Sequence, residues 1–358
     1  MVTRKVQEVG GSTYTVSLPK EWAESAGITE GDEVHLQQLL DDILLVQPPG
    51  RTWDSDGQQV IDVDGAGLRY LDRIVREAYI AGLESVTVQV DDRFTDGERS
   101  DLLEAARILP GMTVTEQDEM ANTLQSMIDA SDFSPWQSVR QLSFLALTMH
   151  REAEAQFFDA ESAYDMRDRV EEIQRLHALI GRLVRRGLSR IQDADELGLT
   201  FEELLDVWVT ATQLRRVARE AKRIPTGSSI EDIGADAVAG DIRSVCQSVR
   251  GALSAAVSVV VGDADPVIAL RALDSHRALQ ESVSELRRDQ VQYPESQFEV
   301  QCLLASIVRT AECAATIANL GIQAGIREGE LTGFDSDGFD DSEIEPTIGD
   351  LWNRGLND

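Results

Sequence analysis

Helix-boundary signals between residues 133 and 326 constrain the fold of this chain more than any other feature of its sequence. Helix-capping residue pairs recur at five places: Ser134-Pro135, Thr200-x-x-Glu203, Ser228-x-x-Glu231, Asp265-Pro266 and Ser296-x-x-Glu299. An oxygen-bearing side chain at the cap accepts hydrogen bonds from the free N–H groups of the first turn, and proline fits the first helical position. This region is therefore predicted to be helical.

The breaks between these signals divide the region into six predicted helices. They fall near residues 159–164, 192–200, 223–229, 262–266 and 290–296. The second helix carries an apolar seam over Val170–Ile191 and the fourth another over Ile242–Val260, as helices in a bundle do. The spacing predicts two tandem three-helix bundles, residues 133–222 and 229–326, within a helical domain of residues 131–328.

In the first fifty residues the apolar side chains recur with a different spacing. Alternating apolar residues predict short strands at Val6–Val9, Thr13–Leu18, Val34–Leu39 and Ile43–Pro48, the last two joined by a turn at Asp41-Asp42. Between them, Lys20–Ala26 is predicted to form a short helix that Gly27 ends. A segment this small, with so few apolar side chains, cannot close a core by itself. Something outside it must complete that core.

Residues 51–130 are predicted to form a small α/β module. Strands are expected at Val60–Val63, Val86–Val90 and Met112–Thr115, helices at Gly67–Ala81 and Glu98–Leu109, and strand character at the start of Asp118–Ile128. This module contains no lysine, which excludes the phosphate-binding loop that needs Gly-Lys at its end. The fold class is thus multidomain α+β.

The chain of 358 residues has 64 acidic and 33 basic residues, a net charge of −31. Its lysines are Lys5, Lys20 and Lys222, and the other basic residues are arginine. Charge repulsion of this size opposes compactness unless salt screens it. We infer a salt-adapted, halophilic protein; the alternative is an ordinary acidic protein from a GC-rich genome.

The sequence also predicts where the protein resides. No apolar run approaches the ~20 residues that cross a bilayer, and the first fifteen residues lack the apolar core of a secretory signal. A cytoplasmic protein that is not membrane-integral is expected. Cys246, Cys302 and Cys313 suit neither a disulfide framework nor a zinc site, and they are predicted to be small buried hydrophobes.

Residues 4–46, RKVQEVGGSTYTVSLPKEWAESAGITEGDEVHLQQLLDDILLV, resemble the AbrB/SpoVT swapped-hairpin family. The order of strand, glycine turn, strand ending in Leu18-Pro19, short helix and hairpin covers nearly the whole family module. The resemblance implies that residues 1–50 of two chains interleave into one β-barrel, which makes the protein a homodimer and a DNA binder. The residues expected at the DNA are Arg4, Lys5, Ser12, Thr13, Thr15 and Lys20.

This DNA-contact set departs from the family. Ser12, Ala23 and Glu24 stand where the family has arginines, and residues 1–50 hold three basic against eight acidic residues. The alternative is therefore that the N-terminal domain only dimerises.

The helical region resembles the PhoU family, cytoplasmic regulators associated with phosphate uptake that consist of two three-helix bundles side by side. The resemblance lies in LRRVAREA at 214–221 and IVRTAECA at 307–314, which match in part a Leu-Glu-Arg-Ile-Ala-Asp type motif. An AbrB-like domain followed by a PhoU-like domain resembles archaeal, haloarchaeal-like phosphate uptake regulators. The resemblance implies partners in the phosphate transporter or its signalling pathway.

PhoU-like proteins often hold metal clusters through acidic pairs four residues apart on a helix. The matching positions here are Arg215, Arg219, Val308 and Glu312. Because arginine cannot become a metal ligand, Glu312 is only a weak candidate, and no metal or other cofactor is expected. The two guanidinium groups either hold an anion such as phosphate or pair with a neighbouring Asp or Glu, and the ion pair is the favoured interpretation.

Other titratable residues point to no chemistry. The acidic residues spaced four apart, Glu281 with Glu285 and Asp289 and Asp168 with Glu172, are interpreted as solvated helix faces. The histidines of the helical region, His150 (with Glu154 four residues on) and His177, are interpreted as hydrogen-bonded core residues rather than ligands. No nucleophile stands beside a plausible base, so the chain is expected not to be an enzyme.

Together these features predict a DNA-binding transcriptional regulator of phosphate uptake and phosphate homeostasis. The alternative is a cytoplasmic adaptor of the phosphate transporter or its signalling partner. Residues 329–358, which are strongly acidic, are expected to form a disordered tail.

The charge inference predicts that stability rises with salt. Because screening relieves repulsion among the acidic residues, we expect the midpoint of thermal unfolding to rise by many degrees between dilute buffer and molar KCl. Circular dichroism across a KCl series measures this, and an unchanged midpoint would remove the inference of salt adaptation.

Overall fold

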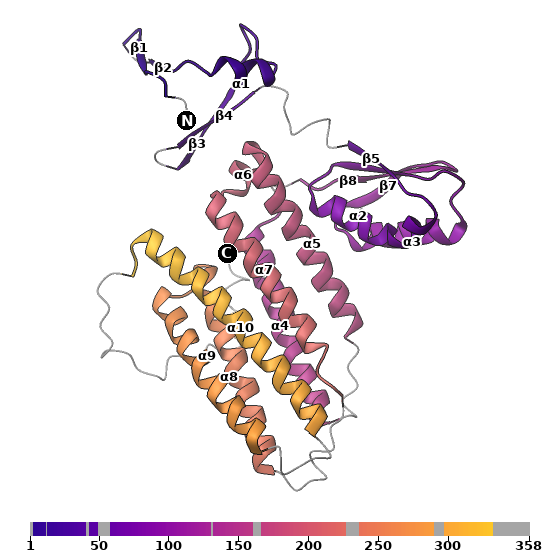
Figure 1. Ribbon diagram of the computed structural model, residues 1–358, viewed down its shortest axis with the longest axis vertical. Coiled ribbons are helices and arrows are strands. Elements are labelled where there is room, and N and C mark those ends of the chain that lie inside the picture. Colours follow the sequence, from indigo (N-terminus) through magenta and orange to yellow (C-terminus); the bar gives the residue numbers. More distant parts are fainter. Residues whose placement is uncertain are drawn as a thin grey trace.

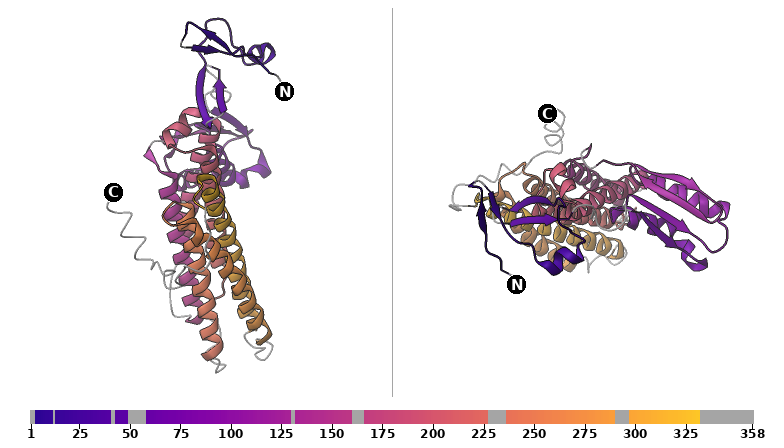
Figure 2. Two further views of the ribbon diagram at one scale, coloured as in Figure 1. Left: turned by 90° about the vertical axis from the view of Figure 1, so that its left-hand side faces the viewer. Right: turned by 90° about the horizontal axis from the view of Figure 1, so that it is seen from above.

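The computed structural model describes residues 3–11, 13–40, 43–48, 58–129, 132–159, 166–226, 236–289 and 297–331. Figure 1 shows three successive parts along the chain: a group of short strands with one helix, a layer of strands and helices, and a set of long helices. The views in Figure 2 place the α/β layer beside the long helices and the N-terminal strands beyond one end of them.

The N-terminal part consists of two hairpins and one helix. Its elements are β1 (Gln7–Val9), β2 (Thr13–Thr15), α1 (Lys20–Ser25), β3 (His35–Leu40) and β4 (Ile43–Gln47). Gly10 and Gly11, at φ of 70° and 76°, turn the chain between β1 and β2 in a conformation that glycine adopts without strain. These elements lie where the sequence predicts them, except that β2 ends at Thr15 rather than at Leu18. Asp41 and Asp42 lie outside the described residues.

The second part is a four-stranded sheet with two helices on one face. Its elements are β5 (Gln58–Asp62), the 3-10 helix η1 (Gly65–Tyr70), α2 (Leu71–Ile80), β6 (Ser85–Gln89), α3 (Asp96–Ile108), β7 (Met112–Gln117) and β8 (Ala121–Ser126). The strand order is β5-β6-β8-β7, in which β5 runs parallel to β6 and the other pairs are antiparallel. The core between sheet and helices includes Val75, Val88, Leu102 and Leu124, all buried.

Two details of this part differ from the sequence prediction. The expected helix Gly67–Ala81 starts as η1 and becomes α-helical only at Leu71. The last strand begins at Ala121 rather than at Asp118, because the N–H of Asp118 donates to the carbonyl of Ala121 (2.7 Å) and closes the β7–β8 turn.

The third part contains the long helices that the sequence predicts and one short helix, α6. They are α4 (Pro135–Phe158), α5 (Arg167–Ser189), α6 (Ile191–Leu197), α7 (Phe201–Ala221), α8 (Asp236–Val260), α9 (Pro266–Asp289) and α10 (Gln297–Glu328). Ser134 caps α4, and Thr200 with Glu203 forms the predicted capping box of α7. Short α6 was not predicted; it occupies the expected break at 192–200 and ends at Gly198, at φ 63°. Ser228, Glu231, Ser296 and residues 332–358 lie outside the described residues.

These helices share one continuous apolar core. Helices α4, α5 and α7 contact one another, as do α8, α9 and α10, and further contacts join α7 to α10 and α4 to α8. Leu142, Leu214, Leu253 and Ile307 are buried in this core, each contributing roughly 1.5–3 kcal/mol by leaving water. Residues Phe298–Glu328 of α10 are long and apolar enough to span a membrane, but 56% of their most apolar window is buried in the structure, as in a bundle core helix.

A buried arginine joins the α/β layer to the helices. Arg182 of α5 is fully buried, and its Nη1 donates to the carbonyl oxygens of Tyr79 (3.1 Å) and Leu83 (2.7 Å) at the end of α2. The carbonyl of Tyr79 also accepts the N–H of Gly82 (3.0 Å), and the guanidinium adds a positive charge at the negative end of α2. Burial lowers the pKa of Arg182 to about 10. Nearby, Arg190 bonds Glu84 at 2.5 Å.

The apolar cores of the layer and the bundle meet at Trp208 of α7, which packs against both. Gly181 of α5 makes this close approach possible: a Cβ atom there would lie 2.9 Å from Cζ3 of Trp208 and 3.0 Å from Cγ2 of Ile80.

We therefore expect Gly181→Val to lower the free energy of unfolding by about 1–3 kcal/mol, because the added methyl groups overpack the junction. Gly251→Ala is the matched control: it also replaces a helical glycine, but its Cβ meets open space, so stability should rise by about 0.5–1 kcal/mol. Denaturant unfolding in molar KCl measures both. Equal stability of Gly181→Val and wild type would contradict the assignment.

Candidate nucleic-acid and dimer interface

The apolar side chains of the N-terminal domain face solvent. Tyr14 is 74% exposed and Val6 64%, and Val9, Val16, Leu36 and Leu44 are each more than half exposed. None of these residues belongs to a hydrophobic cluster of the described structure. Six large apolar side chains are thus exposed among the first fifty residues, and we expect a binding partner to cover them.

Its strands also lack neighbours. Hairpin β1–β2 and hairpin β3–β4 form two separate two-stranded sheets. A lone two-stranded hairpin is marginally stable in water, and its outer edges carry free N–H and C=O groups. Added strands would pair these edges and cover the apolar side chains at once, so one partner could meet both needs.

The predicted DNA residues fall into two groups on this domain. Arg4 and Lys5 precede β1 at the open end of the β1–β2 hairpin, where the chain also continues toward α1 and Lys20. Thr13 and Thr15 lie on β2 and share one side of the strand because side chains alternate. Ser12 lies outside the described residues. All five described side chains are solvent-exposed.

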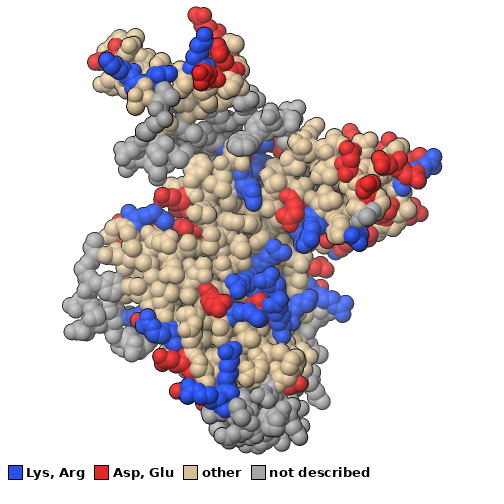
Figure 3. Space-filling model, viewed as in Figure 1, with Lys and Arg blue, Asp and Glu red and all other residues tan. Residues whose placement is uncertain are grey.

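Carboxylates reduce the positive charge of this end. Lys20 lies 3.6 Å from Glu24 on the next turn of α1. Asp32 accepts hydrogen bonds from the backbone N–H and then the hydroxyl of Thr29, which lower the pKa of its carboxyl group and keep it ionised. Figure 3 shows basic and acidic side chains side by side on the N-terminal domain. Arg4 and Lys5 are the basic residues there without an ion pair among the described residues.

The motif positions of the helical region lie on α7 and α10, which pack against each other. Arg219 lies 3.9 Å from the carboxylate of Glu220, as the favoured ion-pair interpretation expects. Glu312 pairs instead with Arg216, at 3.6 Å. Arg215 forms no ion pair with any residue that the structure describes, so that interpretation fails for Arg215. Val308 is half-buried on α10.

A metal site is not assembled from these positions. Within the described ranges, no group of three or more His, Cys, Asp or Glu residues is placed to hold a metal ion. Glu312 has a guanidinium neighbour rather than a second carboxylate.

His150 and His177 are buried core residues as predicted, but the predicted hydrogen bonds are missing among the described residues at three of their ring nitrogens. Burial lowers the pKa of each to about 3, so both are neutral. Neither ring nitrogen of His150 has a hydrogen-bond partner in the described structure, nor has Nε2 of His177. Cys246 and Cys313 are buried as predicted, whereas Cys302 is only half-buried.

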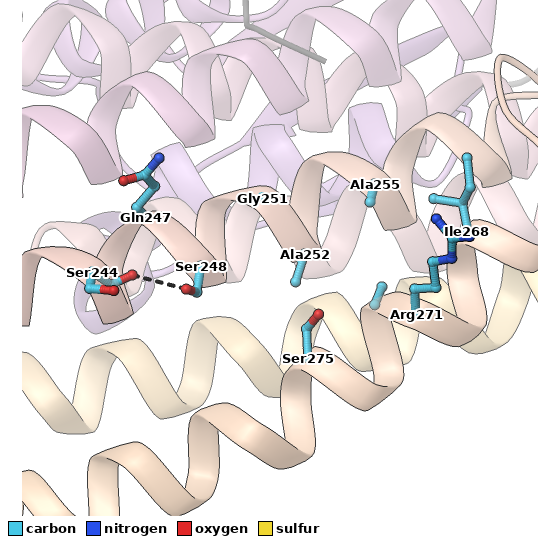
Figure 4. Close-up of a pocket in the computed structure, with 10 residues that line it drawn as sticks. Ser244, Gln247, Ser248, Gly251, Ala252, Ala255, Ile268, Arg271 and Ser275 are labelled. Carbon is cyan, nitrogen blue, oxygen red and sulfur yellow. Dashed lines mark hydrogen bonds between the residues drawn. The ribbon is translucent and has the colours of Figure 1, made fainter. Parts of the chain in front are cut away.

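A cleft lies between α8 and α9 and is lined mostly by small, uncharged residues. It encloses about 280 Å³, and small residues such as Gly251, Ala252 and Ser275 line it. As Figure 4 shows, the hydroxyl of Ser248 is already engaged with the carbonyl of Ser244 (3.0 Å). Arg271 is the single charged residue among its lining residues, and Ser244, Ser248 and Ser275 supply hydroxyl groups.

Comparison with known families identifies the N-terminal domain. The family described as "Antidote-toxin recognition MazE, bacterial antitoxin" matches residues 7–54, so this domain is of the MazE/AbrB type. Domains of that type commonly dimerise and bind DNA. Comparison of the whole chain with curated proteins finds no match.

The exposed apolar surface predicts that assembly depends on this domain. We expect a homodimer that the double substitution Val9→Asp, Val16→Asp dissociates, because each carboxylate would have to leave water when a partner covers it. Light scattering in molar KCl gives the mass. Glu8→Gln, an exposed change on β1, is the control and should leave the dimer intact. We also expect removal of residues 1–50 to leave a body lighter than a dimer, and a fully dimeric body would show that assembly lies elsewhere.

Proposed function

We propose that the chain is a homodimeric, DNA-binding transcriptional regulator of phosphate uptake. One observation carries the proposal: the N-terminal domain, of a type that commonly dimerises and binds DNA, exposes the apolar residues that would form its core. A second copy supplies the missing strands and doubles the set of basic residues at the open end of the hairpin.

The phosphate part of the proposal rests on the PhoU-like features of the helical region. The two motif stretches fall on α7 and α10, each the last helix of a group of three long helices, α4 with α5 and α7, and α8 with α9 and α10. This placement supports a duplicated three-helix architecture. The helical region would then contact the phosphate transporter or its signalling partner.

DNA binding by such an acidic chain cannot rely on phosphate contacts alone. Release of counterions contributes little affinity when the surrounding salt is concentrated. Arg4 and Lys5 would position the duplex, while hydroxyls of Thr13 and Thr15 reach polar groups of the bases. Thr15 already directs its hydroxyl to the carbonyl of Gln7, at 3.3 Å, so a DNA contact by Thr15 would use the free lone pairs of its oxygen.

A second candidate function is a transporter adaptor whose N-terminal domain only dimerises. The pairing of Lys20 with Glu24 favours it, because one of the three basic residues of the domain is already compensated. Under this alternative the helical region regulates the transporter by binding it or its signalling partner, and the protein does not bind DNA.

The proposal predicts that the double substitution Arg4→Ala, Lys5→Ala abolishes DNA binding and leaves the dimer intact. Fluorescence anisotropy with phosphate-transport promoter DNA across a KCl series measures it, and the wild type should show only a weak dependence on salt. Arg277→Ala, which removes an exposed arginine of α9, is the control and should bind as the wild type does.

Equal binding by wild type and double variant, or no binding at any salt concentration, would favour the adaptor. Chromatin immunoprecipitation from phosphate-replete and phosphate-starved cells tests the regulatory target. Enrichment at phosphate-transport promoters is the expected result.

A further inference from the structure

Strand β5 lies at an edge of the four-stranded sheet and has one free side. In the order β5-β6-β8-β7, it pairs with β6 alone among the described strands. The N–H of Val63 donates to the carbonyl of Gln89 at the end of β6 (2.8 Å). Because backbone groups alternate along a strand, the N–H and C=O groups of Gln58, Val60 and Asp62 point away from β6. A row of unpaired backbone groups is a template for a further strand.

The two edges of the sheet differ in their protection against such pairing. At the other edge, β7 has a register irregularity between Val114 and Glu116, and Glu116 places a charge there. Bulges and charged side chains are devices that keep edge strands from pairing. Strand β5 pairs in unbroken register over Gln58–Asp62, and its one charged residue is Asp62 at its end. The β5 edge therefore keeps the regular geometry that strand addition needs.

An exposed apolar side chain lies at the middle of β5. Val60 is 61% exposed, whereas Ile61 packs against the core between the sheet and its helices. Val60 thus lies on the sheet face opposite α2 and α3, because side chains alternate. On that face Val60 stands opposite Thr87 of β6, and Thr87 stands opposite Thr123 of β8 with their hydroxyl oxygens 3.0 Å apart. This row of side chains ends at Val60, beside the free edge.

Strand β5 is self-complementary about Val60, the third of its five residues. If two β5 strands pair antiparallel, Val60 stands opposite Val60 of the second copy, and Gln58 stands opposite Asp62 at both ends. The outward N–H and C=O groups of the two valines exchange two hydrogen bonds, and each Gln58 amide can donate to a carboxylate. A twofold axis at Val60 relates the two copies, as a closed dimer requires.

The N-terminal domain would hold the β5 strands of two copies near each other. Strand β4 ends at Gln47 and β5 begins at Gln58, so the ten residues between them span at most about 40 Å. Figure 1 shows β5 on the side of the α/β layer that is nearest to the N-terminal strands. Two short strands pair weakly on their own, but a tether of this length raises their effective concentration once the N-terminal domains have joined.

We propose that β5 pairs antiparallel with β5 of a second copy about Val60, so that the two four-stranded sheets of the homodimer form one continuous sheet. The inference rests on the homodimer of the proposed function, and it requires neither DNA binding nor phosphate. The pairing also links the two helical regions, because Arg182 joins each α/β layer to its own bundle.

Cross-linking of the full chain by a short bismaleimide in molar KCl tests the pairing. Most of the Val60→Cys protein should become a covalent dimer on a denaturing gel, because the two thiols face each other across the twofold axis. Thr113→Cys is the matched control, since Thr113 is exposed on the other edge strand, β7, and it should give little dimer. The wild type measures the background from the native thiols of Cys246, Cys302 and Cys313.

A second variant removes the hydrogen bonds across the axis. Val60→Pro deletes the N–H that points away from β6 and leaves the β5–β6 ladder intact, as proline on an edge strand does. The dissociation constant of the dimer, measured by analytical ultracentrifugation, should rise by about fivefold or more, because two backbone hydrogen bonds are lost. Val60→Thr keeps the N–H and should dissociate as the wild type does. Unfolding midpoints establish that both variants are folded.

The outcomes separate this inference from the proposed function. A dimeric Val60→Cys protein that cross-links no more than Thr113→Cys would overturn the β5 pairing and leave the N-terminal dimer standing; the β5 edge would then be open to an extended segment of another protein. An unchanged dissociation constant in folded Val60→Pro would also overturn the pairing. A wild-type chain that light scattering finds to be monomeric would contradict both the pairing and the proposed homodimer.

Discussion

The guanidinium group of Arg182 is buried where α5 crosses the end of α2, and the relation between the two largest parts of the structure depends on it. Removing a guanidinium from water costs several kcal/mol unless hydrogen bonds replace the lost solvent. Two carbonyl oxygens at the α2 end accept hydrogen bonds from Nη1, and the ring of Tyr79 lies 4.9 Å from the guanidinium carbon, whereas Nε and Nη2 have no hydrogen-bond partner among the described residues. The same contact holds α2 against α5.

Charge is distributed unevenly along this chain. Acidic residues outnumber basic ones over most of the chain, and dissolved salt would screen the repulsion among them. Arginines gather on α7 beyond what Glu220 can neutralise, whereas the N-terminal domain keeps only Arg4 and Lys5 without an ion pair among the described residues.

Local signals predicted most elements of the fold. The capping box of Thr200 with Glu203 and the cap of Ser134 were found from sequence alone, because a cap needs only residues three apart. Helix α6 was missed, since seven residues between two breaks show too little periodicity to separate a helix from a loop. The late start of β8 was missed too, because a hydrogen bond between Asp118 and Ala121 closes a turn that alternation does not reveal.

The sequence by itself determined the order of the elements, the presence of arginines at two of the motif positions and the lack of a core in the first fifty residues. Periodicity, capping and composition depend on neighbours a few positions away, so they can be read along the chain. Only the tertiary structure decided that Arg215 forms no ion pair among the described residues, while Arg216 and Arg219 each lie near a carboxylate. The electrostatic surroundings of a side chain depend on which helices pack together, and that choice is made by buried surface shared between distant segments.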